Sequence, residues 1–170
     1  MWIFWLGTIL LFYILATLQA GFFAHFNFLG AVPNLVFIFF LLVLFFSVKK
    51  SGFSLIIFAA AAGFFLDIFS GTNFGVSVIL LALIGFLAKK AQGSFLEEED
   101  KYPLSHFLLI FLSALFIYEV LLMLYLRFLD PAHVKILIDF RFLFEIIYNL
   151  IVATAGFYIY KKVIGFTKKI

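Results

Sequence analysis

Residues 59–75 read AAAAGFFLDIFSGTNFG. Small residues recur at every fourth position of this stretch: Ala59, Gly63, Gly71 and Gly75. The remaining position of the same series is Asp67. Residues four apart lie on one face of a helix, so the carboxylate shares a face with the small residues. A carboxylate in so apolar a run is costly to bury unless it is paired or hydrogen-bonded, and its role therefore decides how this region folds.

The composition of the 170-residue chain is that of a membrane protein. Hydrophobic residues make up 66% of the chain, charged residues only 12%, and the mean hydropathy is +1.24. A water-soluble domain could not cover so many apolar residues with so few polar ones, so lipid must be the solvent. The apolar runs are continuous and about 18–22 residues long, which predicts several membrane-spanning helices rather than a β-barrel. The chain has no cysteine, which excludes a disulfide framework, a thiolate metal site and a cysteine nucleophile.

We predict an all-α integral membrane protein, with residues 1–170 forming a single transmembrane domain of six helices. The spans are expected at about residues 1–22, 31–48, 52–69, 72–88, 104–126 and 142–160. Pro33 suits the first turn of the second span, where its missing N–H costs nothing. The N-terminal run has no positively charged start and no small-residue cleavage site, so we expect a retained helix rather than a signal peptide.

The basic residues predict the orientation of the bundle. With a cytoplasmic N-terminus, nine of them lie inside: Lys49, Lys50, Lys89, Lys90, Lys101, Lys161, Lys162, Lys168 and Lys169. Only three lie outside: Arg127, Lys135 and Arg141. The positive-inside rule then places both termini in the cytoplasm. The three outside residues belong to segment 127–141, where we expect a short amphipathic helix on the outer surface or, alternatively, an irregular loop.

Asp67 falls in the last turn of the third span, near the external interface. The negative end of the helix macrodipole lies there, which is unfavourable for an anion. The carboxylate therefore needs donors, and Thr72, Asn73 and the backbone N–H groups of the glycine-flanked turn are the nearest candidates. The small residues on its face predict close approach of another helix. Two roles are open for Asp67: it pins the outer turn, or it contacts a ligand or partner.

Other polar residues fall at a similar depth in the outer half of the spans: Gln19, His25, Glu119, Glu145 and Asn149. Glu119 is either a buried, hydrogen-bonded residue or a contact to a partner. The three histidines are far apart in the chain, and no phosphate-binding loop or nucleophile–base set is present. We therefore expect no metal site, no cofactor and no enzymatic activity.

Residues 31–90 resemble the rod shape-determining protein MreD family. The resemblance rests on the Pro33-Asn34-Leu35 start of the second span, the Gly63-to-Asp67 end of the third, and Gly71, Gly75 and Gly85 after it. Pro-Asn-Leu stands here where Pro-Asp-Leu is common in the family. From the residues and the resemblance together, we expect a structural or partner-binding motif. Its residues are Pro33, Ala59, Gly63, Asp67, Gly71, Gly75 and Glu119.

The resemblance implies a non-enzymatic scaffold of the bacterial cell-elongation complex in the inner membrane. Its partners would be an MreC-like single-span protein, MreB, RodA and a class B penicillin-binding protein, and nucleic acid would not be among them. The implied fold resembles the six-helix substrate-binding subunits of energy-coupling-factor transporters. A vitamin-binding subunit of such a transporter is the alternative function, because Ala16 and Ala20 form a small-xxx-small pair in the first span.

Overall fold

The computed structural model describes residues 2–27, 30–46, 52–71, 73–95, 103–129 and 140–167. These residues form six α-helices: α1 (Trp2–Leu18), α2 (Leu35–Phe46), α3 (Gly52–Ser70), α4 (Val76–Phe95), α5 (Leu104–Leu129) and α6 (Phe140–Thr167). A π-helical turn, η1 (Gln19–Phe23), directly continues α1. The all-helical prediction is confirmed.

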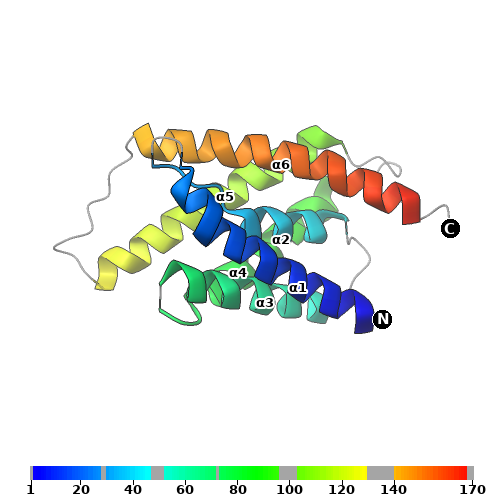
Figure 1. Ribbon diagram of the computed structural model, residues 1–170. Coiled ribbons are helices and arrows are strands. Elements are labelled where there is room, and N and C mark those ends of the chain that lie inside the picture. The colour runs from blue at the N-terminus through cyan, green and yellow to red at the C-terminus, as the bar shows by residue number, and fades with distance from the viewer. Residues whose placement is uncertain are drawn as a thin grey trace.

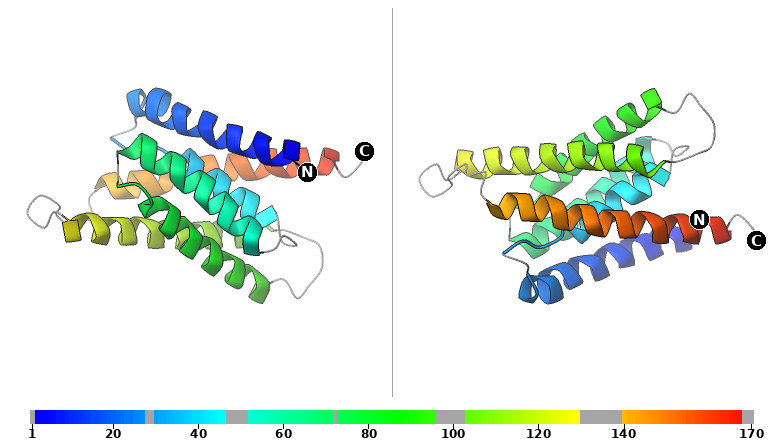
Figure 2. Two further views of the ribbon diagram at one scale, coloured as in Figure 1. Left: turned by 90° about the horizontal axis from the view of Figure 1, so that it is seen from below. Right: turned by 90° about the horizontal axis from the view of Figure 1, so that it is seen from above.

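Successive helices run in opposite directions along the bundle, and both termini lie at the same end (Figures 1 and 2). We call this the terminal end and the opposite one the distal end. The distal end contains the turn between α3 and α4 and the N-terminal starts of α2 and α4. The pair α3 and α4 has the most extensive contact in the bundle, and α2 contacts each of the other five helices.

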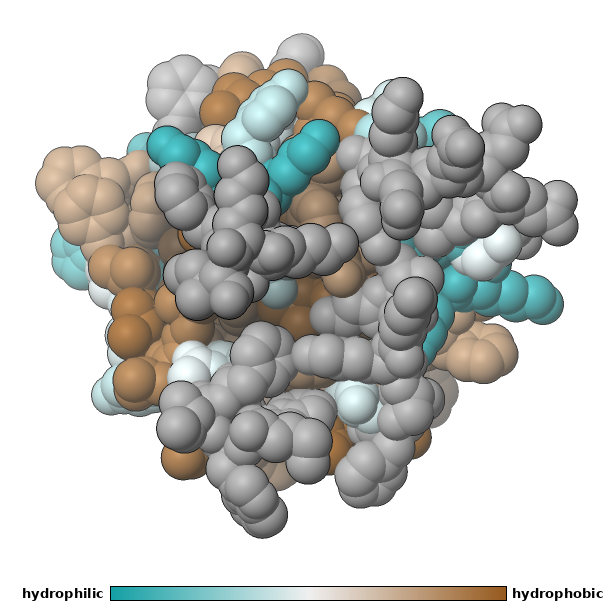
Figure 3. Space-filling model, turned by 90° about the vertical axis from the view of Figure 1, so that its right-hand side faces the viewer, coloured by the Kyte–Doolittle hydropathy of each residue, from teal (hydrophilic) through white to brown (hydrophobic). Residues whose placement is uncertain are grey.

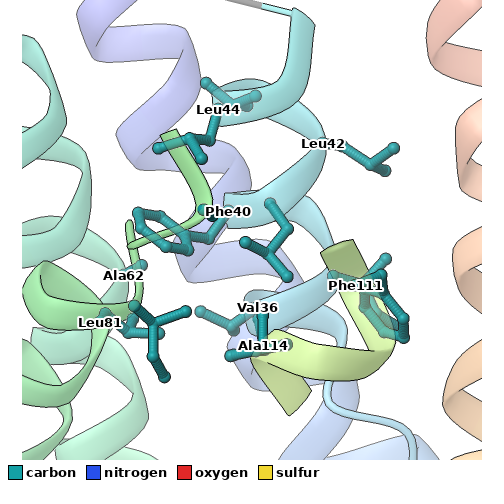
Figure 4. Close-up of a cluster of buried hydrophobic side chains, with 14 of the residues drawn as sticks. Val36, Phe40, Leu42, Leu44, Ala62, Leu81, Phe111 and Ala114 are labelled. Carbon is teal, nitrogen blue, oxygen red and sulfur yellow. The ribbon is translucent and has the colours of Figure 1, made fainter. Parts of the chain in front are cut away.

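Helix α2 lies at the centre of the bundle. Its sequence, LVFIFFLLVLFF, is apolar on every face, and a helix of this kind is stable only when it is surrounded. Ten of its twelve residues are buried. Val36, Phe40, Leu42 and Leu44 of α2 form a cluster with Ala62, Leu81, Phe111 and Ala114 from α3, α4 and α5 (Figure 4).

Four segments are long and apolar enough to cross a membrane: Leu6–Phe23, Val76–Gly93, Leu104–Leu129 and Phe142–Val163. The apolar helices Leu35–Phe46 and Ser54–Ser70 are shorter. At about 1.5 Å per residue, the twelve residues of α2 extend over roughly 18 Å, less than a hydrocarbon core of about 30 Å. Four candidate spans are therefore established, and the six-span arrangement stays a prediction.

Several helix boundaries differ from the sequence prediction, and two of the differences have a clear cause in side-chain hydrogen bonds. Pro33 was placed in the first turn of the second span, but α2 begins at Leu35, because the preceding Asn34 caps the helix. Helix α4 continues to Phe95, past the predicted end at residue 88. Its extra turns carry Gln92, which is buried and donates from Nε2 to the backbone oxygen of Phe45 at 2.6 Å. This bond satisfies one of the free carbonyls at the end of α2. Residues 130–139 of the predicted amphipathic segment lie outside the described residues.

Candidate functional site

Asp67 lies in the last turn of α3 and is only 2% exposed. Its Oδ2 accepts a hydrogen bond from the Gly75 N–H at 2.6 Å, and its Oδ1 accepts one from the Ser77 N–H at 2.9 Å. The predicted backbone donors of the glycine-flanked turn are thus confirmed. Asn73, another predicted donor, donates from Nδ2 to the Tyr125 hydroxyl at 2.9 Å. Thr72 lies outside the described residues.

The geometry also explains how a carboxylate can be stable at the C-terminal end of α3. Asp67 is near the negative end of α3, but its two amide donors flank Val76, the first residue of α4. The N-terminus of a helix has free N–H groups and the positive end of its macrodipole, and a carboxylate satisfies both. Asp67 therefore caps the following helix with a side chain from the preceding one.

The small-residue stripe brings α3 against α4. A Cβ on Gly63 would overlap the Cα and backbone N of Val78 and would lie 2.8 Å from the carbonyl carbon of Ser77. Ala59, one turn earlier, is fully buried. The close approach that the stripe predicted is therefore present, and at Gly63 the neighbour is α4 of the same chain.

Two glycines shape the turn between these helices. Gly71 follows the last residue of α3 and has φ +69°, the left-handed conformation that commonly ends a helix. Gly75, the amide donor to Asp67, has φ +96°. Both conformations strain any residue with a Cβ, so these glycines are required by the backbone.

The start of α2 is held by three side chains. The Asn34 side chain caps the helix, with its Oδ1 accepting from the Phe37 N–H at 3.0 Å. Asn149 of α6 is fully buried, and its Oδ1 accepts from the Asn34 N–H at 2.8 Å. Gln19, in the π-helical turn, accepts from the Val36 N–H at 3.5 Å. Pro33 is buried immediately before the cap.

Tyr118 of α5 lies between the starts of α2 and α4. Its hydroxyl is 3.2 Å from the Ser77 hydroxyl, and its ring centroid is 5.1 Å from that of Phe37. Together these residues form what we call the distal polar layer: Gln19, Asn34, Asp67, Ser77, Tyr118 and Asn149. The sequence placed Gln19, Asp67 and Asn149 at this depth, whereas Asn34, Ser77 and Tyr118 were missed as site residues. Only Asn34 had a local signal, since Pro-Asn before an apolar run is typical of a helix start.

Glu119 follows Tyr118 on α5 and is half-buried. Its carboxyl group interacts electrostatically with that of Glu145 on α6. The structure therefore places Glu119 beside the distal polar layer and near the carboxyl group of Glu145. It does not bring Glu119 to the α4 cap that Asp67 forms. His25 donates from Nδ1 to the backbone oxygen of Gly21, one turn earlier, at 2.7 Å. Among the described residues, no three His, Cys, Asp or Glu side chains gather as metal ligands would.

The hydrogen bonds of the layer end mainly on backbone amides at the starts of α2 and α4. Such bonds fix helix positions, because a buried N–H without an acceptor costs about 1–3 kcal/mol. The arrangement can therefore hold the distal end of the bundle in one geometry.

Replacing Asn149 with alanine should lower the free energy of unfolding by about 1–3 kcal/mol, because the Asn34 N–H loses its acceptor inside the bundle. The matched control is Thr154→Ala on the same helix, since the Thr154 hydroxyl donates to the Leu150 oxygen one turn away in α6 itself. We expect it to change stability by less than about 0.5 kcal/mol. Thermal unfolding followed by circular dichroism in detergent compares the two, and equal stability of both variants would contradict the role of Asn149.

The comparisons with known proteins give one positive result. The family model described as rod shape-determining protein MreD matches residues 1–168, essentially the whole chain. No curated protein and no solved structure matches the chain.

Proposed function

The chain belongs to the MreD family of rod shape-determining proteins, and we propose that it is a non-enzymatic membrane scaffold of the bacterial cell-elongation complex. Family membership implies a part in determining rod shape. The finer proposal is that the chain couples an MreC-like single-span protein and MreB to peptidoglycan synthesis. RodA and a class B penicillin-binding protein would be further members. The protein would lie in the inner membrane with both termini in the cytoplasm, as its lysines predict.

The match over residues 1–168 is the observation that carries this proposal. The geometry supports it in two ways. Asp67 and Asn149, at 2% and 0% exposure, accept hydrogen bonds from backbone amides at helix starts, so these buried polar side chains stabilise the bundle itself. Helices α1 and α6 expose large apolar side chains, among them Leu10, Ile14, Ile151 and Ile159, through which transmembrane partners can pack.

We propose that the motif residues act by setting the shape of the α3–α4 hairpin. Gly63 and Ala59 allow the close approach, Asp67 fixes the start of α4, and Gly71 and Gly75 form the turn between them. Pro33 is buried immediately before the Asn34 cap of α2, and the half-buried Glu119 is the motif residue that would contact a partner.

Co-purification with the MreC-type protein of the same bacterium tests the scaffold proposal. We expect the wild-type chain to retain this partner in detergent, and Asp67→Ala or Gly63→Leu to retain much less, because both changes displace α4. Gly93→Ala, at an exposed glycine of α4 with open space around it, serves as the control and should retain the partner fully. Only protein that elutes as a single peak in size-exclusion chromatography is compared, so that unfolded material does not count.

The same variants have a cellular readout. In a rod-shaped bacterium that depends on this chain, Asp67→Ala should produce rounded cells, whereas Gly93→Ala should keep rods. If Asp67→Ala and Gly63→Leu both retained the partner fully and kept the cells rod-shaped, the α3–α4 hairpin would not be needed for the scaffold function.

No observation favours the transport alternative. Ala16 of the small-xxx-small pair is buried in the core at 2% exposure, so only Ala20 of this pair lies on the surface, where a transporter partner could pack. A vitamin retained in stoichiometric amount by the purified protein, detected by mass spectrometry, would nevertheless favour transport over the scaffold.

A further inference from the structure

The distal polar layer contains two groups of hydrogen bonds, contributed by different helices. In the hairpin group, Asp67 of α3 accepts from the Ser77 N–H at the start of α4. In the α2–α6 group, Asn149 of α6 accepts from the Asn34 N–H before α2 and donates from Nδ2 to the Glu145 oxygen at 2.8 Å. The first group holds the α3–α4 hairpin together, and the second holds the start of α2 against α6.

Tyr118 of α5 contacts both groups. Its hydroxyl is 3.2 Å from the Ser77 hydroxyl of the hairpin group. Its ring centroid is 5.1 Å from that of Phe37, whose N–H donates to the Asn34 side chain at 3.0 Å. Tyr118 is 4% exposed and Phe37 is fully buried, so both rings are enclosed by the bundle. A continuous series of contacts therefore runs from α6 through α2 and α5 to the α3–α4 hairpin.

This series joins two helix starts, where a small displacement has a large effect. The first N–H groups of a helix have no acceptor inside the helix, so they depend on side chains such as those of Asp67 and Asn149. Close-packed interiors transmit a displacement to their neighbours instead of absorbing it. A shift at the start of α2 moves the Phe37 ring against Tyr118, and the Tyr118 hydroxyl passes the shift to Ser77.

We propose that Tyr118 couples the start of α2 to the start of α4, so that a displacement of α6 at Asn149 loosens the α3–α4 hairpin. The coupling is reciprocal, because one free energy connects the two groups. A molecule that displaces α6 can then change the hairpin without touching it. This inference concerns the bundle itself, goes beyond the scaffold function and does not depend on any protein partner.

Hydrogen exchange of the full chain in detergent, resolved to single amides at temperatures well below unfolding, tests the proposal. Asn149→Ala removes the acceptor of the Asn34 N–H. We expect the amides of Gly75 and Ser77 to exchange about threefold or more faster in this variant than in the wild type. Tyr118→Phe keeps the buried ring and removes only the hydroxyl. In the Tyr118→Phe background, Asn149→Ala should cause no further acceleration at either amide.

Two matched controls separate this route from general loosening of the bundle. Gln92→Ala removes another buried bond to α2, the one to the Phe45 oxygen. This bond lies at the terminal end, where hydrophilic side chains are exposed among apolar ones (Figure 3), and its loss should leave exchange at Ser77 unchanged. Tyr125→Phe removes a tyrosine hydroxyl two turns further along α5 and should preserve the effect of Asn149→Ala.

The reverse direction gives a second, independent measurement. Asp67→Asn weakens the hairpin group and should accelerate exchange of the Asn34 and Phe37 amides about threefold or more. This acceleration should again be absent when Tyr118 is replaced by phenylalanine. Asp67→Asn keeps one acceptor oxygen and the size of the side chain, so it remains informative even where Asn149→Ala disturbs folding.

Three results would overturn the proposal. The first is unchanged exchange of Gly75 and Ser77 in Asn149→Ala, which would show that the two groups are independent. The second is equal acceleration with and without the Tyr118 hydroxyl, which would mean that the coupling does not pass through it. The third is equal acceleration in Gln92→Ala, which would indicate general loosening of the bundle.

Discussion

Gly63→Ala should lower the free energy of unfolding by about 3 kcal/mol, the upper part of the usual range for overpacking. The added methyl group would overlap the Cα and N of Val78 and approach the carbonyl carbon of Ser77. These are backbone atoms of α4, so no side-chain rotation can relieve the contact, and the two helices must separate. Thermal unfolding in detergent measures the effect.

Gly93→Ala is the matched control for this change. Gly93 lies in α4, and a Cβ there meets nothing within 4 Å. Because alanine is the better helix former by about 1 kcal/mol, this variant should be as stable as the wild type or slightly more stable. If the two alanine variants unfolded at the same temperature, the result would contradict the claim that α3 and α4 approach too closely at Gly63 to admit a Cβ.

Much of the fold could be predicted from solvent preference alone. Long apolar runs predict helices whatever their neighbours are, and the bounds of α3 agree with the predicted third span to within one residue at its end. The need of Asp67 for donors was also predictable, since a buried carboxylate at the negative end of a helix has few alternatives. Both inferences depend only on residues close together in the sequence.

The positions of the helices in the bundle could not be predicted in the same way. In α2 every face is apolar, so its sequence does not distinguish a central helix from one in lipid. The hydrogen bond from the Asn34 N–H to Asn149 joins residues 115 positions apart, and the sequence around either residue does not predict the other as its partner. The start of α4 was predicted too early, because Gly71 to Gly75 form the turn whose last amide binds Asp67.

Asp67→Ala should be the most damaging change to the distal polar layer. It removes the acceptor of the Gly75 and Ser77 N–H groups, and the latter lies in the buried interior. With about 1–3 kcal/mol for the buried Ser77 N–H left without an acceptor and less for the part-buried Gly75 N–H, the loss is about 3 kcal/mol. Asp67→Asn keeps one acceptor oxygen and should lose about half as much. Asn73→Ala, at an exposed residue of the same turn, serves as the control and should lose less than about 1 kcal/mol.

Hydrogen exchange gives this prediction a local readout. In Asp67→Ala the amides of Gly75 and Ser77 should exchange faster than in the wild type, while amides in the middle of α5 should be unchanged at temperatures well below unfolding. Unchanged exchange at both positions would show that the carboxylate does not hold the start of α4.

The double variant Gly63→Ala/Asp67→Ala should lose less stability than the sum of the two single variants. Gly63→Ala already pushes Ser77 and Val78 away from α3, which lengthens the bond from the Ser77 N–H to Asp67 before the carboxylate is removed. Residues that act on one contact show coupling of about 0.5–3 kcal/mol, whereas independent sites add within about 0.5 kcal/mol. Strict additivity would mean that the small-residue contact and the carboxylate cap stabilise separate parts of the protein, and the α3–α4 hairpin would then not be a single unit.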